Sequence, residues 1–193
     1  MMRMVFVLMV FSSYLDEAGA RDVPRPMARG LLRRAEGVTS TMSTTVTTER
    51  SVEVLNSLLR GEISAQEAHE KALALSADMT ANEIAEIRRI SAEHTRSAEA
   101  LRTEVFRLGG QPAGSAGAWG AFARAFQSSA NLLGVSTAFS SLCEGEEHGL
   151  KEYEEALEAA SGPTRTLLQE VLIPNQRTHI AALGVIGSRR RAD

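Results

Sequence analysis

Two glutamates and two histidines occur in the same order in the two halves of the chain. Glu62 and Glu146 each follow a glycine, and His94 and His179 each lie well downstream of one of these glutamates. Carboxylates and imidazoles are common ligands of iron, manganese and zinc. A carboxylate inside an apolar core is costly unless it is paired, hydrogen-bonded or bound to a metal. The pattern therefore predicts a metal site or a buried polar network shared by two similar halves.

Helical periodicity places these residues on apolar stripes. Leucine, isoleucine, valine and alanine recur at three- and four-residue spacing along four segments, which is typical of amphipathic helices. Polar residues interrupt each stripe and are expected to face the interior. In chain order, these polar residues are Glu62 with His69, Ser91 with His94, Glu146 with Tyr153, and Gln176 with His179.

Four long helices are therefore expected to position the site. Gly109-Gly110 should end the second helix, and Pro174 should kink the fourth, because proline lacks an N–H and crowds the preceding turn. Ser64 begins a possible capping box, so the first segment could be two helices that meet near Gly61. A short helix is expected between the second and third. The predicted helices cover about residues 49–76, 82–108, 119–133 and 136–160, with the last following Pro163.

Composition favours one all-α domain. The 193 residues are 44% hydrophobic and only 5% aromatic, and good helix formers are abundant. A net charge of -3 argues against nucleic-acid binding. Cys143 is the only cysteine, so there is neither a disulfide framework nor a zinc-type cysteine cluster.

The organisation along the chain is predicted in three parts. Residues 1–47 are interpreted as a leader or disordered linker, residues 48–187 as the helical bundle, and residues 188–193 as a basic tail that is most simply a solvated end. The apolar run near the N-terminus is too short to span a bilayer. It could be a secretion signal, or translation could start at Met42. We expect a cytoplasmic protein, with export as the alternative if residues 1–20 are a signal peptide.

The helix order, the internal repeat and the placement of the glutamates and histidines resemble the ferritin-like superfamily. Over about residues 49–187, the chain is similar to a little-characterised bacterial ferritin-like group defined as a domain of unknown function. The resemblance implies a four-helix bundle with an internal two-fold repeat and a long helical crossover between helices two and three. The segments that carry it are residues 54–59 (VLNSLL), 108–112 (LGGQP) and 145–147 (GEE).

The resemblance also implies a ligand set. In iron-binding members, helices one and three each supply a glutamate, and helices two and four each supply Glu-x-x-His. By position, Glu62 and Glu146 match the single glutamates, and His94 and His179 match the histidines. The metal ligands implied here are therefore these four residues, with Gln176 as a fifth.

Two of the superfamily's carboxylates are replaced in this chain. Ser91 and Gln176 stand three residues before the two histidines, where glutamates would be expected. Glu93 is adjacent to His94, but neighbouring helical residues point about 100° apart, so Glu93 is expected to be a poor substitute. The remaining donors could hold one divalent ion of iron, manganese or zinc. A metal-free network is the alternative, in which Glu62 and Glu146 bond to the histidines and Tyr153.

These features lead to three functional hypotheses. The first is a small non-cage ferritin-like protein with at most one metal ion, serving in stress or metal handling without fast turnover. The second is a di-iron oxidase or ferroxidase, and the third is a metal-free structural or interaction module. Neither nucleic acid nor a membrane span is expected, and a homodimer through helix packing stays open. The sequence leans against an enzyme and identifies no catalytic residue.

Overall fold

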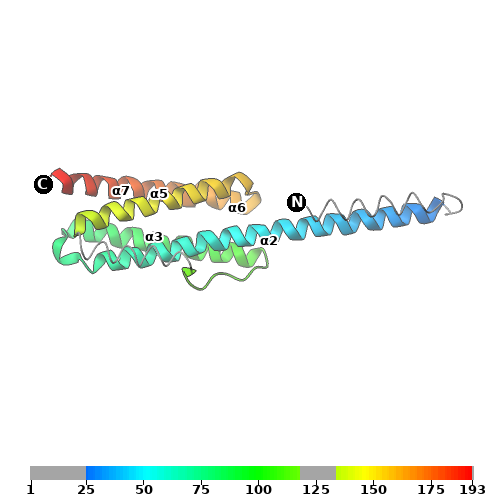
Figure 1. Ribbon diagram of the computed structural model, residues 1–193, viewed down its shortest axis with the longest axis horizontal. Coiled ribbons are helices and arrows are strands. Elements are labelled where there is room, and N and C mark those ends of the chain that lie inside the picture. The colour runs from blue at the N-terminus through cyan, green and yellow to red at the C-terminus, as the bar shows by residue number, and fades with distance from the viewer. Residues whose placement is uncertain (1–24, 118–133, 193) are drawn as a thin grey trace. The chain divides into compact units, whose positions relative to one another are not determined.

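A computed structural model of the chain describes residues 25–117 and 134–192, with side chains from residue 48 onward (Figure 1). The described residues form helices and contain no β-strand, which confirms the all-α prediction for this part of the chain. The predicted helix over 119–133 lies outside the described residues. The elements are α2 (Arg25–Leu73), the 3₁₀-helix η1 (Ser76–Asp78), α3 (Ala81–Arg107), α5 (Val135–Ala159), α6 (Gly162–Leu167), the π-helical segment η3 (Leu168–Leu172) and α7 (Ile173–Ala192).

The chain divides into two compact units, Met1–Val46 and Thr47–Asp193. In the first unit, the structure describes α2 from Arg25 onward, so residues 25–46 are helical where the sequence indicated a leader or disordered linker. The physical reason is that Pro26 lies in the first turn of α2, where proline is tolerated, and no proline follows within residues 27–47.

The second unit contains four helical segments that lie side by side (Figure 1). They are α2 from residue 47, then α3, α5 and the continuous run of α6, η3 and α7. Short connections make α2 antiparallel to α3, and α5 antiparallel to α7. Val135 at the start of α5 packs in one cluster with Ile87 near the start of α3, so α3 and α5 run in the same direction. Two parallel helices need a long connection, and residues 108–134 join them.

Two apolar clusters fill the interior and leave a polar layer between them. One cluster includes Ala72, Ile90 and Leu183, and the other includes Leu55 and Leu101, with all five side chains fully or almost fully buried. The predicted stripes are confirmed as the inward faces of the helices. The polar residues of these stripes therefore lie in the middle of the bundle, with apolar packing on both sides.

The ends of α3 follow the local sequence closely. Thr80 caps the N-terminus in a capping box with Glu83. At the C-terminus, Gly109 adopts a φ of +76°, a conformation that side chains disfavour, as the predicted helix stop requires. By contrast, α2 continues without interruption through Gly61, and Ser64 is buried inside the helix. The suggested break and capping box in the first segment were therefore wrong.

The predicted disturbance at Pro174 takes the form of a wider helical turn. The π-helical segment η3 immediately precedes α7, in which Pro174 is the second residue. Proline crowds the carbonyl four residues before it, which belongs to Glu170 in η3, and a wider turn gives that carbonyl room. Beyond this turn, Gln176 and His179 both face the interior.

The basic C-terminal segment is docked on the bundle. Helix α7 continues to Ala192, and Arg190 donates to Glu83 with N–O distances of 2.6 and 2.7 Å. The Arg190 guanidinium also lies 5.7 Å from the centre of the Phe139 ring. The prediction of a solvated tail over residues 188–193 was therefore wrong at Arg190, because this long side chain reaches the first turn of α3. Among the described helices, none combines the length and apolar character that crossing a membrane requires.

Candidate functional site

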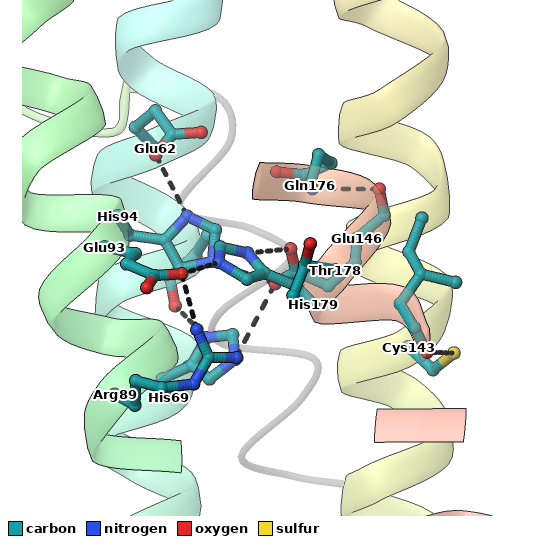
Figure 2. A network of polar contacts seen from close by, with 12 residues as sticks. Glu62, His69, Arg89, Glu93, His94, Cys143, Glu146, Gln176, Thr178 and His179 are labelled. Atoms are coloured by element: carbon teal, nitrogen blue, oxygen red, sulfur yellow. Dashed lines mark hydrogen bonds and ion pairs between the residues drawn. The ribbon is translucent and has the colours of Figure 1, made fainter. Parts of the chain in front are cut away.

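A cluster of buried polar side chains occupies the layer between the two apolar clusters (Figure 2). All four helical segments of the bundle contribute to it. Each member is at most 5% exposed, and polar atoms buried to this degree are nearly always hydrogen-bonded in proteins. The members are Glu62 and His69 from α2, His94 from α3, Glu146 and Tyr153 from α5, and Gln176 and His179 from α7.

His94 lies at the centre and touches two carboxylates. Its Nδ1 is 2.9 Å from Oε2 of Glu62, and its Nε2 is 2.9 Å from Oε1 of Glu146. Ionised carboxylates only accept hydrogen bonds, so both ring nitrogens donate and the ring is an imidazolium. Burial alone would lower the pKa of His94, but the charges of Glu146 and Glu62 outweigh burial and raise it to about 10. A positive charge is thus held between helices α2 and α5.

Glu146 is the carboxylate shared by all three buried histidines. Its Oε2 accepts from Nδ1 of His179 at 3.2 Å, and its Oε1 lies 2.9 Å from His94 and 3.6 Å from Nε2 of His69. Burial by itself would raise the pKa of Glu146, but the neighbouring histidines, His94 foremost, hold it far below the usual range. Glu146 therefore stays ionised although its side chain is only 2% exposed.

Glu93 joins the cluster, which the sequence analysis did not predict. Its Oε2 accepts from Nε2 of His179 at 2.7 Å and from Nη1 of Arg89 at 2.8 Å. Burial would raise the pKa of Glu93, but these two partners lower it. Glu93 was expected to point away from the inward face of α3. That expectation was wrong because Glu93 lies at the edge of this face, from which its long side chain reaches His179 on α7. Among the contacts of the cluster in the described residues, none involves the Ser91 side chain.

His69 differs from the other histidines because one of its nitrogens has no hydrogen-bond partner. Its Nδ1 lies 2.9 Å from the carbonyl oxygen of Ala65, which can only accept, so Nδ1 carries the proton. Burial lowers the pKa of His69 to about 4, so the ring is neutral near pH 7 and Nε2 carries a lone pair. This Nε2 is the one buried side-chain nitrogen or oxygen without a partner in the described part of the chain.

Tyr153 and Gln176 complete the cluster from its edges. The Tyr153 hydroxyl donates to Oε1 of Glu62. The Gln176 amide donates to the backbone carbonyl of Glu146 at 2.9 Å, and a Cβ on Gly149 would come within 2.8 Å of that amide nitrogen. The Gln176 amide thus bonds to the main chain of α5, whereas the resemblance implied that Gln176 is a metal ligand.

Three of these residues offer ligand atoms that could converge on one metal ion. The side chains of His69, His94 and Glu146 present atoms that all lie within 4.8 Å of one another. A bound ion with bonds of about 2.0–2.2 Å would need these atoms roughly 3 to 4 Å apart, so only a small contraction is required. His69 also donates its other ring nitrogen to a backbone carbonyl, the usual outer-shell partner of a metal-binding histidine. The donor set fits a divalent ion.

The structure brings together all five residues predicted as ligands, Glu62, His94, Glu146, Gln176 and His179. The sequence analysis placed His69 on the inward stripe but did not assign it as a ligand. The available signal was its position seven residues after Glu62, on the same helical face. Glu67 and Glu147 could serve as ligands only if α2 or α5 shifted its phase at Gly61 or Gly145, and both helices are continuous there.

The fold and site together define an all-helical protein with a buried cluster of histidines and carboxylates between its helices. The chain belongs to the family described as Domain of unknown function (DUF2383), whose model matches residues 50–159. This range includes His69, His94 and Glu146, whereas α7 with Gln176 and His179 lies beyond it. No curated protein and no solved structure matches the chain.

Proposed function

We propose that the protein is a small metal-handling protein of ferritin-like architecture that holds one divalent ion at His69, His94 and Glu146. The observation that carries this proposal is the lone pair on Nε2 of His69, which is buried and lies 3.6 Å from a Glu146 carboxylate oxygen. Two electron-rich atoms facing each other without a proton between them are unfavourable. A cation between them removes this repulsion and satisfies both atoms.

The charges of the site allow a metal ion to take the place of a proton. Glu62 and Glu146 are both buried, and the His94 imidazolium lies between them. Metal binding requires neutral imidazoles, so an ion bound by His94 must displace its proton. When bound, the ion would supply the positive charge that the imidazolium supplies in its absence. With the ion on Nε2 of His94, the Nδ1–H would still donate to Glu62, which also accepts from the Tyr153 hydroxyl.

Iron, manganese and zinc are the metals that this donor set suits, because two imidazoles and a carboxylate combine nitrogen and oxygen ligands. A cavity of about 150 Å³ borders the histidines, which is ample for a hydrated ion. This supports storage, transfer or sensing of an ion.

A metal-free structural core is the second candidate, and a specific observation favours it. Both nitrogens of His94 and both nitrogens of His179 already contact carboxylates. Only His69 is left unsatisfied. In a metal-free protein, the polar layer would serve to fix the register of the four helices, a role known for some buried polar groups.

The deciding experiment is the metal content of the chain by elemental mass spectrometry, on protein purified without chelators or metal affinity resins. It is repeated after loading with Zn²⁺, with Mn²⁺ and with Fe²⁺ under nitrogen. One ion per chain supports the proposal. No bound ion after any loading refutes it and leaves the structural core. Two irons per chain with an oxygen-dependent spectral change would instead establish the oxidase alternative.

A further inference from the structure

A cavity of about 150 Å³ lies against helices α2 and α5 and borders both the buried cluster and the surface. His69, His94 and Glu146 line it on the inside, and each is at most 2% exposed. His148 and Glu152 also line it, and their side chains are 54% and 28% exposed. One continuous hollow therefore connects the candidate ligands with solvent-accessible side chains on α5.

Small residues on the two facing helices keep this hollow open. Gly61 and Ala65 line it from α2, and Gly145 and Gly149 line it from α5. A Cβ added at Gly61 would meet no atom within 4 Å, so the space beside it is unfilled. Glycine inside a helix is unfavourable by roughly 1 kcal/mol relative to alanine. Gly61 thus leaves space inside a long helix, whereas Gly149 gives room to the Gln176 amide at the edge of the cavity.

The two ends of the cavity carry donor atoms of the same kind. At the outer end, Nε2 of His148 lies 3.7 Å from Oε1 of Glu152, one helical turn further along α5. At the inner end, Nε2 of His69 has no hydrogen-bond partner. An imidazole and a carboxylate at this spacing face the same side of a helix and can hold a cation together. Glu144 adds a further exposed carboxylate at the outer end.

We propose that this cavity is the route by which a divalent cation passes from His148 and Glu152 at the surface to His69, His94 and Glu146 in the interior. This inference rests on the proposed function and adds to it the path and the outer loading site. The ion exchanges its water ligands for protein ligands in two stages, first at the exposed pair on α5 and then at the three buried ligands. Apart from the coordination bonds, the N–H bond at Nε2 of His94 is the one bond of the protein that breaks. Its electron pair becomes the donor to the ion, and its proton passes to solvent water.

Plugging the cavity provides the test. Gly61→Leu places a good helix former in the unfilled space, so helix α2 is not weakened by the change. Uptake of Co²⁺ and its release to excess chelator are followed by stopped-flow absorbance. We expect both rates to fall on the order of tenfold, with an unchanged Kd, because a blocked path slows passage in both directions equally.

Gly184→Leu is the matched control, since Gly184 is also a helical glycine with nothing within 4 Å of an added Cβ, and it does not line the cavity. Its rates should equal those of the wild type. Equal rates for Gly61→Leu and wild type would overturn the route. If Gly61→Leu does not fold, Ala65→Met fills the same cavity from the next turn of α2 and is judged by the same two rates.

The outer pair has its own test. The double variant His148→Gln, Glu152→Gln should take up Co²⁺ more slowly than the wild type and show a weaker dependence of the uptake rate on salt, because charge at the opening attracts the cation. An unchanged rate and salt dependence would remove these residues from the route. Failure of the wild type to bind Co²⁺, Zn²⁺, Mn²⁺ or Fe²⁺ would refute the proposed function itself, whereas binding with rates insensitive to Gly61→Leu refutes only the route.

Discussion

Nε2 of His69 faces Oε1 of Glu146 across 3.6 Å in the middle of the bundle, without a hydrogen bond between them. The one N–H proton of the neutral His69 ring is on Nδ1, which donates to the Ala65 carbonyl and therefore leaves Nε2 without a proton. The relationship between these two residues is the strongest indication that the polar layer receives a cation, and it leads to predictions for metal affinity and for stability.

Replacing His69 should separate metal binding from folding. In His69→Leu, the unpartnered nitrogen is replaced by an apolar group, so we expect the loss of bound metal. The metal-free protein should be unchanged or more stable by about 1 kcal/mol, since a buried polar atom without a partner is removed. Isothermal titration with Zn²⁺ and urea unfolding measure the two effects. Glu70→Ala, at an exposed neighbour, is the control. Retained metal binding in His69→Leu would contradict the assignment.

Glu146 should matter for folding even without a metal. Glu146→Ala removes the acceptor of both His94 and His179 and leaves buried donors unpaired. We expect a loss of about 3 to 5 kcal/mol in the free energy of unfolding, as for other broken buried ion pairs. Urea unfolding of the metal-free protein gives this value. Glu147→Ala, at the exposed adjacent position, should change stability by less than about 0.5 kcal/mol. Comparable losses in both variants would show that the network contributes little.

The stability of the metal-free protein should depend on pH in a defined direction above neutrality. The pKa of His94 is raised from 6.5 to about 10, so the folded state binds more protons than the unfolded state between these values. The stabilisation from His94 is therefore complete below about pH 6.5 and is lost as the pH rises through about 10. The pKa of His69 is lowered from 6.5 to about 4, so between these values the unfolded state binds more protons than the folded state. Stability should therefore fall as the pH drops from about 6.5 toward about 4.

Urea unfolding across this pH range, with His94→Gln as the comparison, checks the assignment. The variant should lose the decline that His94 causes between about pH 6.5 and about pH 10. An identical decline in wild type and variant would mean that other groups are responsible.

Arg190 should anchor the end of α7 to α3. Its guanidinium donates to both carboxylate oxygens of Glu83, and these hydrogen bonds are the main reason that the pKa of Glu83 is lowered to about 2. We expect Arg190→Ala to cost about 1 kcal/mol of unfolding free energy, because the pair is only partly exposed. The stabilisation should be present above about pH 4.5 and be lost as the pH falls through about 2. Thermal unfolding measures the loss, and the exposed Arg189→Ala should show none.

The spacing of residues along the sequence was sufficient to find the inward faces of the helices. An α-helix repeats every 3.6 residues, so apolar residues at that spacing fix which side chains face the core. Glu62, His94, Glu146, Gln176 and His179 were found in this way, and all five are buried together. The end of α3 at Gly109 and the distortion before Pro174 were predictable for a similar reason, because both follow from the backbone preferences of single residues.

Only the tertiary structure decided which of these groups touch. Glu93 binds His179 and Arg190 binds Glu83 because helices distant in sequence lie within reach of long side chains, which periodicity along one helix cannot show. The role of His69 likewise depends on the tilt of its ring toward the Ala65 carbonyl and on the approach of α5, which carries Glu146. The sequence by itself determined the inward faces of the helices and their polar positions, whereas the packing of four helices determined the partners, because contact distances are set between elements rather than within them.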